Sequence, residues 1–301
     1  MSAKSIFVGS LLGDAICLGP HWVYDQEEIA EKIDHPEQFN DPITSYHPNK
    51  KAGDLTHYGD QALLLFRHLS EKGSFDLDAY AKAWRDYWED PETISYRDGA
   101  TRETLKNLQS GLPPEKAGST SHDLGGASTI GPLFFLDWPD DESLVAACRE
   151  LTAFTHNEPD VTAAAEFFAK VILAIRSGKS VADAIDSIGL TLGDSSLGKW
   201  LSAGRESAAS DKTDLKALAE HKLSCPIEGA FPGVCHLLLR HPADPFVAMV
   251  ENARAGGDNA ARGMMLGLVY GAAESIGSLP LEWTENLHSR KMVVESASFG
   301  N

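Results

Sequence analysis

Apolar residues along most of this chain recur at spacings of three and four, and this helical period is the feature that most constrains the fold. The period is clearest in FDLDAYAKAWRDYWED, residues 75–90, and returns in residues 161–178, 180–189 and 244–257. Alternation of apolar and polar residues, which would indicate strands, is hard to find over more than four positions. Asp and Ser stand where helices should begin, and Gly where they should end. We therefore predict an all-α fold.

Two apolar segments carry a glycine at every fourth residue, namely Gly9 and Gly13 in the first and Gly263, Gly267 and Gly271 in the second. Residues four apart lie on one face of a helix, and glycine has no Cβ to hold a neighbouring backbone away. We expect both segments to be central helices. The second is shorter than the roughly 20 apolar residues that a bilayer requires, so we predict a buried helix rather than a membrane span.

The chain is strongly acidic, with 26 Lys and Arg residues against 44 Asp and Glu residues and a net charge of −18. No run of Lys or Arg offers a surface that follows a phosphate backbone, so nucleic acid is not an expected partner. The 301 residues, 43% of them hydrophobic, contain no repeat and no long linker. We expect one domain over residues 1–301, a monomer that does not enter a membrane.

The four cysteines are far apart in the sequence: Cys17, Cys148, Cys225 and Cys235. They form no CxxC pair, and no histidine stands at a zinc-binding spacing from them, so neither a structural zinc site nor a disulfide framework is indicated. Thiols stay reduced in the cytoplasm, and a cytoplasmic location is the one we expect.

Polar residues gather at the ends of the apolar segments, in residues 11–25, 56–61, 118–127 and 256–262. A fifth group, THNEP at residues 155–159, has the character of a loop that enters a helix. Asp14 stands within an apolar stretch, where a carboxylate without partners costs several kcal/mol. Asp14 therefore either holds neighbouring loop amides or reaches a substrate.

Together these segments resemble the ADP-ribosylglycohydrolase family, all-α hydrolases that remove ADP-ribose from modified side chains and related conjugates. The clearest likeness is residues 253–283, where GGD precedes glycines at four-residue spacing and an ending similar to the family's IP..W. GDA at residues 13–15, GP at residues 19–20 and the TH within residues 151–169 agree with the family in order and separation. The resemblance covers roughly residues 5 to 285 and implies a compact multi-helix fold.

The family binds two Mg²⁺ ions through a TDDT stretch and through GGDTDT, and this chain departs from both motifs. The first stretch is THYGDQ here, where the adjacent aspartates are absent and only Asp60 remains nearby. The second is GGDNAAR, which keeps Asp258 but has alanine in place of the second aspartate. Because Mg²⁺ prefers carboxylate oxygens, the resemblance implies a degenerate metal site with no metal cofactor, or one residual Mg²⁺ on Asp258 and Asp60.

The residues that replace the family's ligands are themselves functional, which favours a remodelled site over a decayed one. His57 and Tyr58 are examples, and His21 stands near the place of a family glutamate that acts on the attacking water. We expect Asp60, Asp258 and His57 to be catalytic, with one group positioning water and another protonating the leaving group of a glycosidic bond. The family fold places these further residues at the substrate: Asp14, His21, Tyr58, Gln61, Asp123, His156, Asn157, Asn259 and Arg262.

Several of these residues have a plainer interpretation. His57 can be a core histidine bonded to a carbonyl group, and Tyr58 can simply pack. His156 and Asn157 have the character of loop and capping residues. Residues 97–98 are suited to capping the helix that follows them.

The acidity of the chain limits the ligand that it can hold. Without Mg²⁺, the diphosphate of ADP-ribose would depend on backbone amides, helix N-termini and Arg262. We therefore expect a small-molecule or modified side-chain substrate that is less anionic than intact ADP-ribose, with Trp22 either stacking on it or packed in the core. The fold also has members that serve as lens crystallins or pseudoenzymes, so a non-catalytic ligand-binding or structural role is the second interpretation.

Overall fold

The computed structural model describes residues 2–295, and within these residues the regular elements are all helices, which confirms the predicted all-α class. In chain order the α-helices are α1 Ala3–Ala15, α2 Gln26–Lys32, α3 His57–Lys72, α4 Leu77–Glu89, α5 Gly99–Gln109, α6 Pro114–Ala117, α7 Gly125–Ser128, α8 Asp141–Thr155, α9 Pro159–Arg176, α10 Val181–Gly189, α11 Ser196–Ala208, α12 Asp214–Glu220, α13 Ile227–Arg240, α14 Pro245–Ala255, α15 Asn259–Ala272, α16 Leu281–Asn286 and α17 Arg290–Glu295. Short 3-10 helices are η1 Gly131–Phe135, η2 Leu190–Leu192 and η3 Ser275–Ser278.

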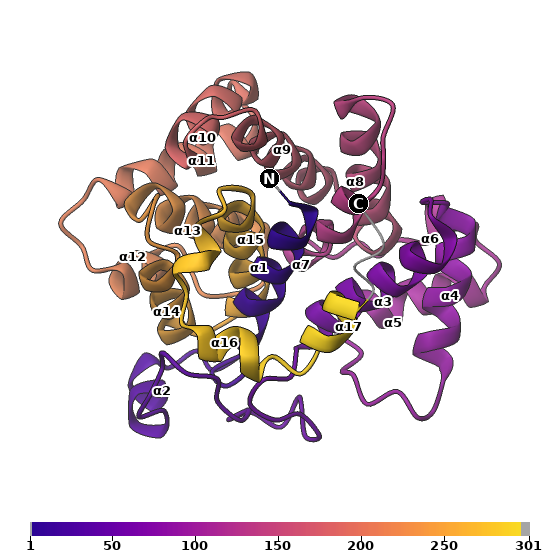
Figure 1. Ribbon diagram of the computed structural model, residues 1–301, viewed down its shortest axis with the longest axis horizontal. Coiled ribbons are helices and arrows are strands. Elements are labelled where there is room, and N and C mark those ends of the chain that lie inside the picture. Colours follow the sequence, from indigo (N-terminus) through magenta and orange to yellow (C-terminus); the bar gives the residue numbers. More distant parts are fainter. Residues whose placement is uncertain (1, 296–301) are drawn as a thin grey trace.

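Helices α1 and α15 lie side by side at the centre of the molecule, with α3–α6 to one side of them and α10–α14 to the other (Figure 1). They contact each other through the glycines that the sequence singles out. A Cβ on Gly263 would lie 2.2 Å from the carbonyl oxygen of Gly13, and one on Gly267 would lie 2.0 Å from that of Gly9. The two helices are therefore antiparallel, and all 14 residues of α15 are buried, which confirms the prediction of central helices.

The turn before α15 depends on two glycines with positive φ. Gly256 and Gly257 have φ angles of 70° and 62°, a region that residues with a Cβ rarely adopt. Both are also closely approached, because a Cβ on Gly256 would lie 2.3 Å from the carbonyl oxygen of Val23. The N–H of Gly257 donates to Val23, and the N–H of Trp22 donates to the carbonyl oxygen of Gly257, at 2.7 and 2.8 Å. These bonds tie the segment after α1 to the start of α15.

The THYGDQ stretch is the beginning of a helix. Thr56 is the N-cap of α3, and its hydroxyl accepts a hydrogen bond from the N–H of Tyr58 at 3.3 Å. Residues 57–61 form the first turn and a half. Successive helical residues point about 100° apart, so the six residues cannot all face one site.

One hydrophobic cluster runs from Ile6 in α1 to Val293 in α17. All four cysteines are free thiols, in agreement with the expectation of no disulfide framework. In the part of the chain that the structure describes, no helix combines the length and the apolarity that crossing a membrane requires.

The contact between α1 and α15 leaves no room for a methyl group. We expect Gly263→Ala to lower the free energy of unfolding by about 3 kcal/mol, because the added Cβ must displace the backbone of α1. Gly277→Ala is the control, since no atom lies within 4 Å of a Cβ at that position, and it should change stability by less than about 0.5 kcal/mol. Urea unfolding measures both values, and similar losses in the two variants would contradict the close contact.

Candidate functional site

A cavity of about 270 Å³ opens where the segment after α1 meets the N-terminal ends of α3 and α5. Its wall consists of five aromatic side chains, two carboxylates, a glycine and a cysteine, namely Trp22, Tyr24, Tyr46, Tyr58, Tyr96, Asp98, Asp123, Gly99 and Cys225. Tyr24 and Tyr46 are 51% and 45% exposed, which places them at the mouth. No Lys or Arg is among these residues, so the wall is neutral to negative.

Trp22 organises the aromatic part of the wall. Its ring stacks on that of His21 with centroids 4.4 Å apart, and it meets Tyr46 and Tyr96 edge to face at 4.9 and 5.2 Å. The φ angle of Trp22 is 61°, a strained conformation for a residue with a side chain, and the hydrogen bond to Gly257 holds it there. The orientation of the indole is thus fixed by the same turn that begins α15.

Asp258 lies beneath the cavity and is fully buried. Its Oδ2 accepts a hydrogen bond from the hydroxyl of Tyr58 at 3.2 Å. Its Oδ1 makes no hydrogen bond of ordinary geometry within residues 2–295, and lies 4.0 Å from Nε2 of His21. Burial, and next the charge of Asp123, raise the pKa of Asp258 to about 6. Tyr58 therefore joins the cavity wall to a buried carboxyl group.

His21 is held in one orientation by Asn259. The side-chain amide of Asn259 donates to the carbonyl oxygen of Ala253 at 3.3 Å, which turns its Oδ1 toward Nδ1 of His21, 3.1 Å away. Nδ1 is thus the nitrogen that carries the proton. Burial, followed by repulsion from His47 and His57, lowers the pKa of His21 well below its usual value. The ring is neutral, with a lone pair on Nε2.

Asp98 supplies a permanent negative charge to the wall. It is the N-cap of α5, as the sequence indicates, and accepts a hydrogen bond from the N–H of Thr101 at 2.7 Å. Its Oδ2 lies 3.5 Å from Nε2 of His57. Burial alone would raise the pKa of Asp98, but the hydrogen bond and charge of His57, with Thr101, hold it well below its usual range.

His156 and Asp123 lie on either side of the start of α7. The His156 ring is buried behind Gly126, and its Nδ1 lies 3.0 Å from the hydroxyl of Thr155. Asp123 is partly exposed and lines the cavity directly. Of these two predicted residues, the structure therefore brings Asp123 to the cavity surface and His156 behind it.

Two residues of THYGDQ face away from the cavity. The carboxylate of Asp60 accepts hydrogen bonds from Nζ of Lys50 at 2.8 and 2.7 Å. Gln61 accepts a hydrogen bond from Nε1 of Trp84 at 3.1 Å, on the side of α4. Because α3 begins at residue 57, its turn directs the first two side chains toward the cavity region and these two toward other neighbours.

Two further predicted residues are also placed elsewhere. Arg262 is buried and donates to the side-chain oxygen of Asn252 and the carbonyl oxygen of Gly256, at 2.9 and 2.6 Å. Asn157 is exposed, and its N–H donates to the carbonyl oxygen of Ser119 at 2.8 Å. Arg262 therefore stabilises the turn before α15, and the cavity wall gains no cation from it.

The contacts of Asp14 favour the structural of its two interpretations, in which it holds neighbouring backbone amides. Its carboxylate accepts hydrogen bonds from the N–H and the hydroxyl of Thr56, at 2.7 and 2.6 Å, and both residues are fully buried. Burial raises the pKa of Asp14 to about 7, although the two bonds from Thr56 lower it. Asp14 thus fixes the start of α3 against α1.

Several residues of the site were missed by the sequence analysis. His47 is buried with its ring centroid 5.5 Å from that of His21 and 5.7 Å from that of His57, while Tyr46 and Tyr96 line the cavity. The first two come from the segment that joins α2 to α3, which contains turns but no helix. An adjacent Tyr–His pair in a long segment without helical period was the available signal.

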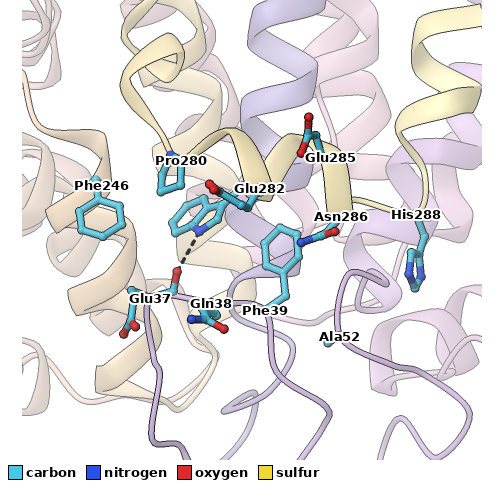
Figure 2. Close-up of a pocket in the computed structure, with 11 residues that line it drawn as sticks. Glu37, Gln38, Phe39, Ala52, Phe246, Pro280, Glu282, Glu285, Asn286 and His288 are labelled. Carbon is cyan, nitrogen blue, oxygen red and sulfur yellow. Dashed lines mark hydrogen bonds between the residues drawn. The ribbon is translucent and has the colours of Figure 1, made fainter.

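A larger cavity, of about 630 Å³, lies beside α16 (Figure 2). There the indole N–H of Trp283 donates to the carbonyl oxygen of Glu37 at 2.8 Å, and Phe39 lies alongside. Glu282 and Glu285 are exposed, and none of the titratable residues that the structure shows on its wall is buried. The smaller cavity, in contrast, has buried carboxyl and imidazole groups at or beneath its wall.

The fold is all-α and of the ADP-ribosylglycohydrolase type. The chain belongs to the ADP-ribosylglycohydrolase family, whose model matches residues 2–298. Crystallin J1A and Crystallin J1B of Tripedalia cystophora are each 23% identical to it, over 98% of this chain and 94% and 95% of theirs. A solved ADP-ribosylglycohydrolase-related protein complex shares the fold, with a TM-score of 0.68 and 19% identity over 98% of this chain and 95% of that one.

The residues at the family's metal positions do not fit Mg²⁺. Asp60 is neutralised by Lys50, and the residues that follow Asp258 on α15 include Ala260 and Ala261, which have no oxygen to offer. Mg²⁺ requires octahedral oxygen coordination, mainly from carboxylates, substrate and water. We derive no step through this ion.

The buried contact between Asp14 and Thr56 should contribute measurably to the free energy of unfolding. We expect Asp14→Ala to destabilise the protein by about 3 kcal/mol at pH 5, because two buried donors of Thr56 lose their acceptor. The pKa of Asp14 is about 7 in the folded chain and 3.8 as an unperturbed group, so the folded state binds the extra proton between these values. Its contribution to stability is therefore lost as the pH rises from about 4 through 7.

The penalty of Asp14→Ala should accordingly be smaller at pH 8 than at pH 5, by about 2 kcal/mol. Urea unfolding at the two pH values measures the difference. Asp211→Ala, at an exposed carboxylate, is the control and should show no such change. An equal penalty for Asp14→Ala at both pH values would show that this carboxyl group does not take up a proton in the folded state.

Proposed function

We propose that this protein hydrolyses a glycosidic bond of a ribosyl conjugate in the aromatic cavity, without the Mg²⁺ ions of its family. The observation that carries the proposal is a pair of carboxyl groups at one cavity. Asp123 lines the wall, and Asp258 is joined to the wall by its 3.2 Å hydrogen bond from the hydroxyl of Tyr58. Glycosidases commonly cleave with two carboxyl groups that flank the bond.

The geometry gives each group a role. In the reactive state Asp258 carries a proton on Oδ2 and the hydroxyl of Tyr58 turns toward the leaving group. Tyr58 then donates its own proton to the leaving group and takes the proton of Asp258 in return, which leaves Asp258 as a carboxylate. The carboxylate of Asp123 accepts a proton from the water that attacks the anomeric carbon. The carbon–leaving-group bond breaks as the carbon–oxygen bond of water forms, so the products are the free sugar and the protonated leaving group.

The wall of the cavity limits the substrate. Five aromatic rings suit a flat or apolar group, and the two carboxylates disfavour an anion. The volume of about 270 Å³ lies below the range of roughly 300–1,000 Å³ typical of drug-sized ligands, which fits a ribosyl ring and part of its conjugate. The wall offers no cation to pair with a diphosphate. The preferred substrate therefore carries no diphosphate near the scissile bond.

A non-catalytic role is the second candidate. Two relatives that align with nearly the whole chain are crystallins, which supports a structural or binding function for this fold. Such a protein would bind ligands in the cavity without turnover.

Hydrolysis of a panel of ribosyl and ADP-ribosyl conjugates, with and without millimolar Mg²⁺, tests the proposal. We expect turnover of a conjugate that lacks the diphosphate, unchanged by Mg²⁺. Asp258→Asn and Asp123→Asn should each lower kcat/KM by about 100-fold or more, as loss of an acid–base group does. Their melting temperatures should show that the fold is retained.

Asp211→Asn, at an exposed carboxylate, is the matched control and should keep full activity. Saturable ligand binding without turnover would favour the non-catalytic candidate. Turnover that requires Mg²⁺, or turnover that survives in both site variants, would contradict the proposed site.

A further inference from the structure

Three histidines from distant parts of the sequence meet below the aromatic cavity. His21 follows α1, His47 lies in the segment between α2 and α3, and His57 is the first residue of α3. Their ring centroids are 5.5, 5.9 and 5.7 Å apart, so the rings form a nearly equilateral triangle. All three side chains are buried, with exposed fractions of 2% or less.

Most nitrogen atoms of this triangle have no partner. Both ring nitrogens of His47, Nδ1 of His57 and Nε2 of His21 are buried without a hydrogen bond of ordinary geometry to any residue that the structure describes, whereas Nε2 of His57 faces Asp98. A buried polar atom left unpaired costs about 1–3 kcal/mol. Four such atoms in one place indicate that a further partner completes the cluster.

The spacing suits a metal ion. One nitrogen from each histidine can be chosen so that all three lie within 4.8 Å of one another. A tetrahedral ion with bonds of about 2.0–2.1 Å needs nitrogens about 3.4 Å apart, so each ring must move inward by less than about 1 Å. His21 and His47 lie outside helices, where such a shift displaces little structure.

From this arrangement we propose that His21, His47 and His57 form a binding site for one divalent transition-metal ion such as Zn²⁺. Three imidazoles and an open fourth position are the ligand set of many catalytic zinc sites. Imidazole nitrogen selects ions of this class over Mg²⁺ and Ca²⁺, which bind through oxygen.

The surroundings of the triangle match those of metal-bound histidines, whose second ring nitrogen is usually held by an acceptor. Nδ1 of His21 donates to Oδ1 of Asn259 at 3.1 Å, which leaves Nε2 for a metal. Nε2 of His57 lies 3.5 Å from a carboxylate oxygen of Asp98, which leaves Nδ1. The rings of Trp22 and Tyr96 in the cavity wall pack against the triangle.

The charges around the triangle also favour a cation. Asp98 lies beside His57, and Oδ1 of Asp258, which has no hydrogen bond of ordinary geometry within the described chain, lies 4.0 Å from Nε2 of His21. The nearby ammonium group of Lys50 is paired with Asp60 at 2.7 Å, which offsets its repulsion. Arg262 also acts on His21, so the triangle has two acidic neighbours, Asp98 and Asp258, against this one further cation.

This site does not depend on the proposed hydrolysis. Its readout is bound metal rather than turnover, so a chain that cleaves no ribosyl conjugate can still bind Zn²⁺. Conversely, failure of the chain to bind Zn²⁺ would remove the metal site and leave the proposed hydrolysis intact.

Metal titration of the full chain tests the site. After removal of metal by a chelator and dialysis, Zn²⁺ is added in competition with a chromophoric chelator, and Co²⁺ is added as a visible-absorption probe. We expect one Zn²⁺ per chain and the intense visible bands of tetrahedral Co²⁺. Mg²⁺ at millimolar concentration should not displace either ion.

His47→Gln should weaken Zn²⁺ binding by at least about 100-fold, and Asn259→Ala by about 10- to 100-fold, as loss of a supporting contact does. His68→Gln is the matched control. His68 is also buried and also has an unpaired Nε2, but lies three turns along α3, and its replacement should leave Zn²⁺ affinity unchanged. Circular dichroism and melting temperatures establish that each variant is folded.

X-ray absorption spectroscopy of the Zn²⁺-loaded natural chain gives a second measurement that needs no variant. We expect three imidazole nitrogens in the first coordination shell. Absence of stoichiometric binding, a shell without imidazole, or unchanged affinity in folded His47→Gln would overturn the proposal.

Discussion

The glycine contact between α1 and α15 determines where the site can form. The helices are antiparallel, so the C-terminal end of α1 and the N-terminal end of α15 lie at the same end of the pair. His21 follows the first of these ends and Asn259 begins the second, and their side chains meet at 3.1 Å. A wider spacing between the two helices, as any pair of side chains would impose, would separate these groups. The close backbone contact therefore positions the site, because it holds these two helix ends near each other.

The sequence was sufficient for the helical class and for the central pair of helices. Both predictions rest on local rules, because a period of three to four and a glycine at every fourth residue describe a helix without reference to its neighbours. The family resemblance added the order of the site segments, and the match over residues 2–298 confirms the family. Of the predicted residues, Tyr58 and Asp123 line the cavity, and the structure gathers four more beneath it, namely Asp258, His21, His57 and Asn259.

The remainder of the site depends on tertiary contacts that no local pattern records. Asp60 is engaged by Lys50, ten positions earlier, and this pairing follows from how the segment before α3 folds back on it. The triangle of histidines joins residues 21, 47 and 57, whose spacings match no metal-binding motif. A search for metal-binding spacings around the cysteines does not find these three histidines.

The segment between α2 and α3 supplies Tyr46 to the cavity wall and His47 to the cluster beneath it. Its own backbone bonds are isolated turns, such as the one from Lys50 to His47, so side-chain contacts account for much of its order. Whatever occupies the cavity or the cluster adds to those contacts. Ligand occupancy and the ordering of this segment are consequently linked equilibria, and tighter binding at the site raises the free energy required to release the segment from the helices. A ligand in the site would thus also stabilise the packing of this segment against the helices.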